Sequence, residues 1–218
     1  MTATTGSQGP AIGPQDPAIA LQGPLTGSQD PAMAGLLLAA GAGTRFGGPK
    51  ALVAFRGRSL VERGVDLLRA AGCDPVLVVV GAQADRVAAL VPGTVVAPEW
   101  ESGMGASLRT GLASLPASVE SVVVALVDQP LVTVEAVRRL MAADGPAAVA
   151  TYAGKARNPV VLHRSTWADV AELAVGDTGA RPWLRAHPAL VTEVPCDDVG
   201  SPFDIDTPAD LATMEAPA

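Results

Sequence analysis

The chain has 218 residues, of which 49% are hydrophobic and 17% charged, and its formal net charge is -7. This composition supplies enough apolar residues for a core that needs no stabilising disulfide bonds or structural metal ions. One domain of about 100–200 residues is expected. The negative charge argues against general binding to nucleic acid or to an anionic membrane surface, so an anionic ligand would need local cations. We therefore expect no nucleic-acid partner and no membrane partner.

The two cysteines, Cys73 and Cys196, are far apart and do not form a C-x-x-C pair, which favours two reduced thiols over a zinc site. No apolar run reaches the ~20 residues that a membrane span needs. The first basic residue is Arg45, so the N-terminus lacks the basic region of a signal peptide. We expect a cytoplasmic protein.

The first 33 residues are rich in Gly, Pro, Ser, Gln and Ala, with a loose echo of GSQGPAI at 6–12 in GSQDPAM at 27–33. Such a segment cannot bury enough apolar surface to offset the entropy of ordering. We predict a disordered tail over 1–33 and one folded domain over 34–218.

From Gly35 onward, short apolar runs alternate with helical patterns. Strands are predicted at 36–40, 75–80, 94–97, 121–127, 147–152 and 159–163, with an edge strand at 191–194. Helices are predicted at 59–72, 84–91, 104–115, 134–143, 166–175 and 180–186, with a last one beginning at 207–208. The start signals include the capping box of Ser59 and Glu62, an N-cap at Thr133, and Thr207 followed by Pro208.

This alternation predicts an α/β fold: a Rossmann-like, mostly parallel sheet with helices on both faces. Such sheets bind ligands outside the carboxyl ends of their strands. Three segments that carry polar or glycine-rich chemistry fall at predicted strand ends, namely 39–50, 128–130 and 204–207.

The first of these segments lies in LLLAAGAGTRFGGPK, residues 36–50. Gly41 and Gly43 allow the backbone to approach a ligand closely, and Arg45 and Lys50 add the charge that a triphosphate needs. The dinucleotide fingerprint fails because its third glycine position holds Phe46, and the P-loop fails because no lysine directly follows Gly48. An ordinary strand-to-helix turn remains the alternative.

Further motifs follow in order along the chain. They are Trp100–Arg109 (WESGMGASLR), ALVDQPLV at 125–132, Asn158-Pro159-Val160, GDTGAR at 176–181 and DIDTPADL at 204–211. With the glycine loop, which resembles L-A-A-G-x-G-x-R-[MF]-G-x-x-K, they resemble the MobA-like nucleotidyltransferases over about residues 34–214. Within that superfamily, which has the nucleotide-diphospho-sugar transferase type of fold, the pattern is most similar to the molybdenum cofactor cytidylyltransferase branch.

The resemblance implies transfer of CMP from CTP to a molybdopterin-type cofactor, with Mg²⁺ bound and pyrophosphate released. It implies catalytic roles for Arg45, Lys50 and Asp128, and metal binding by Asp128 and Asp206, with Asp204 as the alternative second ligand. The predicted nucleotide-binding residues are Leu38, Ala39, Ala40, Gly41, Gly43, Arg45 and Lys50. A molybdoenzyme or its maturation factor is a candidate partner.

Residues that could bind the acceptor lie in the later motifs. Ser102, Ser107 and Arg109 surround a glycine-rich helix start, which favours anions, and Asn158 and Arg181 belong to the matching motifs. Solvated or structural roles for these residues remain open.

Two questions remain: which nucleotide the protein uses, and which class of protein it belongs to. The small side chains of Ala39, Ala40 and Ala42 are expected to shape a pocket that suits a pyrimidine, and guanylyl-transferring relatives usually carry L-A-G-G where this chain has Leu-Ala-Ala-Gly. Guanylyl transfer, nucleotidyl transfer to a sugar phosphate, and a non-catalytic nucleotide-binding module are the alternatives.

Overall fold

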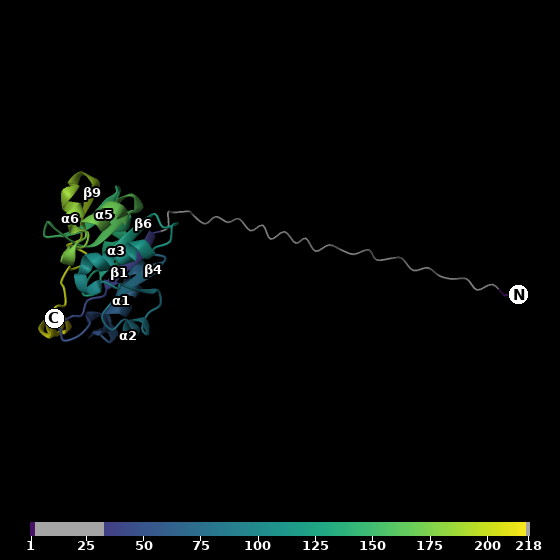
Figure 1. The fold of residues 1–218 in the computed structure, drawn as a ribbon, viewed down its shortest axis with the longest axis horizontal. Coiled ribbons are helices and arrows are strands. Elements are labelled where there is room, and N and C mark those ends of the chain that lie inside the picture. Colours follow the sequence, from purple (N-terminus) through teal and green to yellow (C-terminus); the bar gives the residue numbers. More distant parts are fainter. Residues whose placement is uncertain (3–32, 217–218) are drawn as a thin grey trace.

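The computed structural model describes residues 1–2 and 33–216. The predicted tail therefore lies almost wholly outside the described residues. The first strand, β1, begins at Met33, one residue before the predicted start of the domain. Figure 1 shows strands and helices gathered into one body, with the C-terminal helix at its edge.

Seven strands form the main sheet in the order β5-β4-β1-β6-β8-β7-β9. They are β1 (Met33–Ala39), β4 (Val76–Val80), β5 (Thr94–Val96), β6 (Ser121–Leu126), β7 (Ala147–Tyr152), β8 (Lys155–His163) and β9 (Val191–Pro195). β8 is antiparallel to both of its neighbours, and the other neighbouring pairs are parallel. The prediction of a mostly parallel sheet is confirmed. A separate hairpin pairs β2 (Ala54–Phe55) with β3 (Arg58–Ser59).

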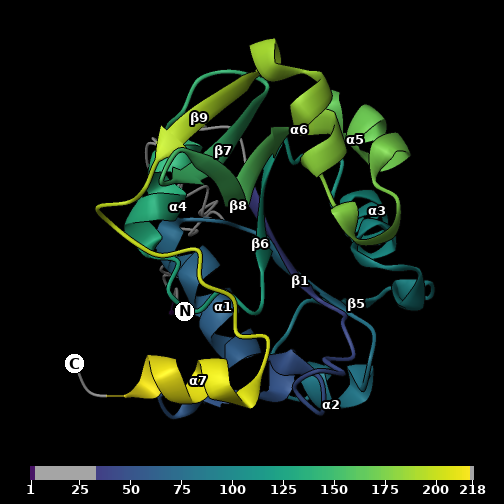
Figure 2. The same cartoon turned by 90° about the vertical axis from the view of Figure 1, so that its left-hand side faces the viewer.

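Helices cover both faces of the sheet. They are α1 (Leu60–Ala71), α2 (Ala84–Ala88), α3 (Met104–Ser114), α4 (Val134–Met141), α5 (Trp167–Leu173), α6 (Arg181–Ala186) and α7 (Pro208–Glu215). Short 3-10 helices are η1 (Lys50–Leu52), η2 (Trp100–Ser102), η3 (Arg164–Thr166), η4 (Gly176–Thr178) and η5 (Pro188–Leu190). Figure 2 shows α1 and α4 on one side of the sheet and α3, α5 and α6 on the other.

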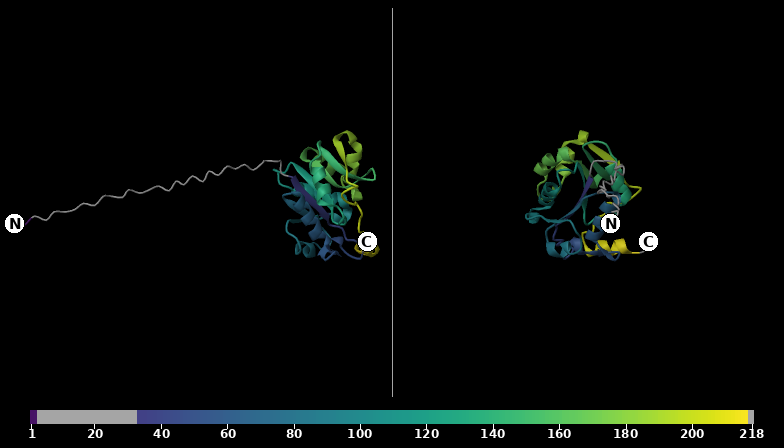
Figure 3. Two further views of the ribbon diagram at one scale, coloured as in Figure 1. Left: turned by 180° about the vertical axis from the view of Figure 1, so that it is seen from behind. Right: turned by 90° about the vertical axis from the view of Figure 1, so that its right-hand side faces the viewer.

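The buried side chains divide in the same way. One apolar cluster packs α1, α2 and α4 against one face of the sheet, and a second packs α3, α5 and α6 against the other. A third, smaller cluster joins Phe55, Leu60 and Ile205, with Leu211 and Met214 of α7 packed against it. It holds the C-terminal helix beside the first half of the chain, as the rear and side views show (Figure 3).

The helix-start signals are confirmed. The Ser59 hydroxyl accepts a hydrogen bond from the Glu62 backbone while Glu62 reaches back, and the helix ends at Gly72 with φ 108°. Thr133 caps α4, and Thr207 caps α7 in a second capping box with Asp210.

Three boundaries differ from the prediction by three residues or more. β1 begins at Met33 rather than at 36. α2 ends at Ala88 rather than at 91, and Pro92 disfavours helical geometry at Val91. β8 begins at Lys155 rather than at 159, because it forms a hairpin with β7 through Ala153 and Gly154. Both turn residues have positive φ, as a two-residue hairpin turn of type I′ requires. Among the described residues, no helix has the length and apolar character needed to cross a membrane.

Candidate nucleotide site at the carboxyl edge of the sheet

The glycine loop follows β1 and folds mainly through its own backbone. The amides of Phe46, Gly47 and Gly48 all donate to the Gly43 carbonyl, at 2.9, 2.9 and 3.2 Å. Gly43 has φ +60°, and a Cβ there would lie 2.0 Å from the Gly48 carbonyl oxygen, so only glycine fits. At Gly41, by contrast, a Cβ would meet no atom within 4 Å. Gly43 is thus required by the loop itself, whereas Gly41 leaves open space beside the backbone.

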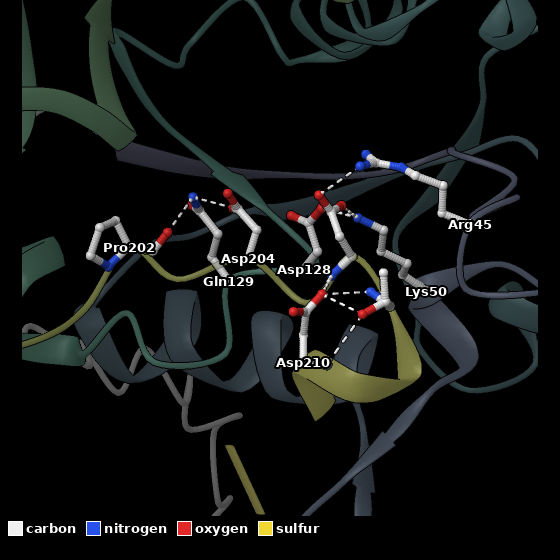
Figure 4. Close-up of polar contacts among 9 residues, drawn as sticks. Arg45, Lys50, Asp128, Gln129, Pro202, Asp204 and Asp210 are labelled. Atoms are coloured by element: carbon white, nitrogen blue, oxygen red, sulfur yellow. Dashed lines mark hydrogen bonds and ion pairs between the residues drawn. The ribbon is translucent and has the colours of Figure 1, made fainter. Parts of the chain in front are cut away.

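A cluster of opposite charges lies beside this loop (Figure 4). The Lys50 ammonium, at the start of η1, contacts Asp128 Oδ2 at 2.7 Å and Asp206 Oδ1 at 2.5 Å. Arg45 reaches the other oxygen of Asp206 at 3.2 Å, and its side chain is 73% exposed. The structure therefore brings together the four charged residues that the resemblance selected. Two of them, Lys50 and Asp206, are more than 150 positions apart in the sequence.

The carboxylates also set the protonation of the lysine. Burial lowers the pKa of Lys50, but the charge of Asp128, the hydrogen bonds to Asp128 and Asp206, and the charge of Asp206 together outweigh it and raise the pKa. Lys50 thus stays a cation between two anions that would otherwise repel each other.

Asp128 and Asp206 are positioned by contacts between the end of β6 and the C-terminal segment. The Ile205 amide donates to the Asp128 carbonyl at 2.8 Å, and the Ile205 side chain is fully buried. The side-chain amide of Gln129 donates to Asp204 Oδ1 at 2.8 Å and to the Pro202 carbonyl at 3.3 Å (Figure 4). These bonds fix the C-terminal segment against β6, and through it the carboxylate of Asp206.

The two neighbouring aspartates of that segment have different surroundings. Asp206 faces Lys50 and Arg45, whereas Asp204 binds Gln129. Loss of hydration raises the pKa of Asp204, the Gln129 hydrogen bond opposes this, and the charges of Asp128 and Asp206 raise the pKa further. Of the two, Asp206 is the one whose carboxylate converges with that of Asp128 on a common cation.

A cavity of about 430 Å³ opens beside the cluster. It is lined by the loop from Leu38 to Thr44, by Lys50 and Asp128, and by the start of α3. Ser107 lines it and is buried, at 4% exposure. The volume lies in the range of small-ligand pockets, about 300–1,000 Å³.

The far wall of this cavity joins two motifs distant in sequence. A Cβ at Gly103 would lie 2.5 Å from the Gly176 backbone, and one at Gly105 would lie 2.3 Å from the Ala174 carbonyl oxygen. Bare glycine backbone therefore lets the SGMGAS segment pack against GDTGAR. Asp177 then lines the cavity and accepts a hydrogen bond from the Met104 amide at 3.3 Å.

The other predicted acceptor residues do not line this cavity. Arg109 donates to the Ala174 carbonyl, which gives it a partner within the fold. Ser102 is exposed, Arg181 is exposed at the start of α6, and Asn158 lies in β8 before the cis peptide bond to Pro159. Their acceptor-binding roles stay predictions.

Two residues without a predicted role belong to the site. Gln129 ties the C-terminal segment to β6, and Asp177 caps the start of α3 at the cavity wall. Both lie inside motifs recognised in the sequence, VDQP and GDTGAR, but nothing local signals their partners, because those partners lie more than 70 positions away.

A Rossmann-like sheet whose strand ends carry a glycine loop, two cations and paired carboxylates defines a nucleotide-binding protein of the α/β class. The chain belongs to the MobA-like NTP transferase family, whose domain model matches residues 35–191. Its fold is that of nucleotidyltransferases of the nucleotide-diphospho-sugar transferase type.

Similar proteins carry several different names. "Nicotine blue oxidoreductase" of Paenarthrobacter nicotinovorans is 39% identical, over 79% of this chain and 91% of that protein. "Bifunctional IPC transferase and DIPP synthase" of Rubrobacter xylanophilus is 31% identical, over 82% of this chain but only 50% of that protein.

Solved structures agree on the fold. Rv0371c of Mycobacterium tuberculosis has a TM-score of 0.75 and 30% identity, covering 84% of this chain and 96% of that one. A manganese complex of Rv0371c is also similar, with a TM-score of 0.72 and 28% identity, covering 84% of this chain and 97% of that one. Molybdopterin-guanine dinucleotide biosynthesis protein A of Archaeoglobus fulgidus has a TM-score of 0.63 at 21% identity, over 84% of this chain and 97% of that one, which shows a shared fold alone. MobA-like nucleotidyltransferases depend on divalent metal ions.

Proposed function

We propose that the chain is a Mg²⁺-dependent nucleotidyltransferase that moves CMP from CTP to a molybdopterin-type acceptor and releases pyrophosphate. One observation carries the proposal: the carboxylates of Asp128 and Asp206 meet the ammonium of Lys50 at 2.7 and 2.5 Å. This cluster borders a cavity walled by the glycine loop. This combination suits nucleotidyl transfer, which depends on positioning and charge stabilisation more than on covalent chemistry by the protein.

The carboxylates fit a divalent ion. Asp128 and Asp206 each direct an oxygen to the same cation, and Mg²⁺ prefers carboxylate oxygens completed by water and phosphate oxygens. Among the described residues, no group of three or more His, Cys, Asp and Glu side chains could hold a metal ion, so the remaining ligands would come from the triphosphate and from water. When bound there, the ion would neutralise charge on the phosphates and polarise them.

The other residues have roles that follow from their positions. Lys50 and Arg45 would bind the phosphates, with Lys50 exchanging its carboxylate partners for phosphate oxygens. The acceptor's terminal phosphate oxygen attacks the α-phosphorus, the bond from the α-phosphorus to the bridging oxygen breaks, and pyrophosphate leaves. The loop amides and the two cations hold the leaving group in line with the attack.

The choice of CTP rests on the loop sequence and on the backbone that it exposes. Ala39 and Ala40 are 2% and 5% exposed, and their methyl groups pack into the two opposite cores. All three alanines line the cavity, and Ala42 is the most exposed of them. Selection between bases would depend on backbone N–H and C=O groups, since a mismatched buried group costs about 1–3 kcal/mol.

The acceptor is proposed from the sequence resemblance to the molybdenum cofactor cytidylyltransferase branch. A molybdoenzyme or its maturation factor would then receive the product. Ser107 is the predicted acceptor residue that lines the described cavity; Ser102, Arg109, Asn158 and Arg181 would act outside it.

Pyrophosphate release tests the proposal directly. The chain would be incubated with Mg²⁺ and each of CTP, GTP, UTP and ATP, with molybdopterin or a sugar phosphate as acceptor. We expect the fastest release with CTP and molybdopterin. A preference for GTP in direct competition would replace the cytidylyl assignment by a guanylyl one, and nucleotide binding without release under every condition would support a non-catalytic module.

A second candidate is an oxidoreductase acting on nicotine blue or a similar dye. The observation in its favour is the 39% identity to nicotine blue oxidoreductase across 91% of that protein. The chain's own thiols are poorly suited to electron transfer, because Cys73 and Cys196 are both buried and burial raises the pKa of Cys73 to about 12. The electrons would then have to come from a separate reductant, and a nicotinamide dinucleotide is the one to test first. Absorbance of the dye with NADH or NADPH, in the presence and absence of the chain, decides this candidate.

A further inference from the structure

A second cavity lies on the other side of β6, between α1 and α4, which are side by side in Figure 2. We call it the α1–α4 groove. It has a volume of about 340 Å³, and its walls are mostly apolar, with Leu67 and Ala70 of α1 facing Val127 and Val134. The nucleotide site does not use this groove, although Leu126 and Val127 border both cavities.

The first unusual feature of the groove is the amide of Gln129. This residue lines the groove and is only 6% exposed. Its nitrogen donates to Asp204 and to the Pro202 carbonyl, both acceptors, so the orientation of the amide is fixed. The Oε1 atom is buried and has no hydrogen-bond partner among the described residues. A buried carbonyl without a donor is costly, so a small movement of the Gln129 side chain that turns this oxygen toward a donor in the groove would be favourable.

The second feature is the guanidinium of Arg63. Arg63 also lines the groove, and its Nε is buried without a hydrogen-bond partner in the described part of the chain. Its guanidinium lies over the Phe55 ring, 5.0 Å from the centroid, which orients the side chain without neutralising it. The neighbouring Arg58, by contrast, pairs with both Glu62 and Asp66. The groove thus has one cation that is not matched by a carboxylate within residues 1–2 and 33–216.

We propose that the α1–α4 groove binds a small organic anion with a flat apolar body and a hydrogen-bond donor. The anionic group would pair with Arg63, the donor would bind Gln129 Oε1, and the apolar body would lie between α1 and α4. This site is separate from the proposed nucleotide site and does not depend on which nucleotide the chain uses. Because Gln129 also holds Asp204, a ligand here contacts the residue that ties the C-terminal segment to β6.

The probe is 8-anilinonaphthalene-1-sulfonate, which has an aromatic body, a sulfonate and an anilino N–H. Its fluorescence is titrated with the full chain, in the presence and absence of CTP and Mg²⁺. We expect saturable binding at one site that CTP does not displace. In ¹⁵N-labelled protein, the side-chain amide resonance of Gln129 is expected to shift as the probe binds.

Two variants locate the site, each with a matched control. Arg63→Gln removes the unpaired charge and is expected to weaken binding by about tenfold or more. Arg69→Gln makes the same change at an exposed position of α1 outside the groove and is expected to have no effect. Ala70→Phe fills the groove from an exposed helix position and should abolish binding, whereas Ala113→Phe, exposed on α3 across the sheet, should not.

The outcomes are decisive in both directions. Absence of saturable binding, full displacement by CTP, or equal affinity in Arg63→Gln and Arg69→Gln overturns the proposal. Thermal melting checks that each variant is folded, and if Ala70→Phe does not fold, the arginine pair and the Gln129 resonance decide. None of these results depends on turnover. The groove proposal can therefore fail while the transferase assignment stands, and the transferase assignment can fail while the groove proposal stands.

Discussion

Two segments supply charge to the same site but are held in different ways. The glycine loop, residues 40–50, is shaped by its own backbone, with three amides donating to the Gly43 carbonyl. The C-terminal segment, residues 200–207, has no regular secondary structure and is held by distant partners at Leu131, Asp128 and Gln129. The comparison teaches that a local motif can be recognised by its residues alone, whereas a docked segment acquires its role from what it docks against.

The largest effect is expected from the residue between the two segments. Asp128→Asn keeps the size of the side chain and removes the charge that Lys50 and a metal ion would share. Loss of a metal-binding carboxylate removes several kcal/mol of charge stabilisation, so turnover should fall about a hundredfold or more. The rate of pyrophosphate release at limiting Mg²⁺ measures this fall in turnover. Asp144→Asn, at an exposed position, is the control. Normal turnover in Asp128→Asn would remove Asp128 from the metal site.

A pair of changes in the C-terminal segment sharpens the comparison. Asp206→Asn removes a carboxylate that faces Lys50. Asp204→Asn, by contrast, leaves an oxygen that can still accept a hydrogen bond from the side-chain amide of Gln129. We expect Asp206→Asn to lower turnover by about tenfold to a hundredfold and Asp204→Asn to have the smaller effect. Measuring kcat over a range of Mg²⁺ concentrations separates the two. The reverse order would make Asp204 the second metal ligand.

Lys50→Met tests the loop's contribution in two readouts. Turnover should fall by about tenfold or more, because a charge-assisted contact to phosphate is worth about 1.5–3 kcal/mol. The variant also leaves Asp128 and Asp206 facing each other without their shared cation. Mn²⁺ should therefore raise the melting temperature of Lys50→Met more than that of the unaltered chain, in which the metal must displace the ammonium. Equal shifts would argue against a metal between these carboxylates.

The smallest effects, in the loop itself, separate folding from binding. Gly43→Ala would place a methyl group 2.0 Å from the Gly48 carbonyl oxygen at a positive φ, and should cost about 1–3 kcal/mol of stability. Gly41→Ala meets no protein atom within 4 Å and should leave the melting temperature unchanged. If the nucleotide lies against this backbone, Gly41→Ala will still weaken CTP binding measured by calorimetry. Unchanged affinity would place the nucleotide away from Gly41.

Much of the fold follows from local patterns. The capping box at Ser59, the N-cap at Thr133 and the apolar runs that became β4 and β6 are determined by residues near one another, and the structure has each of them where it was predicted. The hairpin turn at Ala153 and Gly154 was missed, because a positive φ at alanine is imposed by the pairing of β7 with β8 and not by the residue.

The features of the site can also be divided into those that follow from the sequence and those that depend on tertiary structure. The sequence by itself supplied the glycine loop and, through the resemblance of its motifs, the choice of Arg45, Lys50, Asp128 and Asp206 as candidate site residues, because a motif is a local property. Only the tertiary structure decided that Lys50 bridges the two aspartates, that Asp204 turns to Gln129, and that Gly103 and Gly105 let α3 pack against Asp177 and its neighbours. These contacts join residues more than 60 positions apart, and their energies depend on distance and burial after folding, which no local pattern encodes.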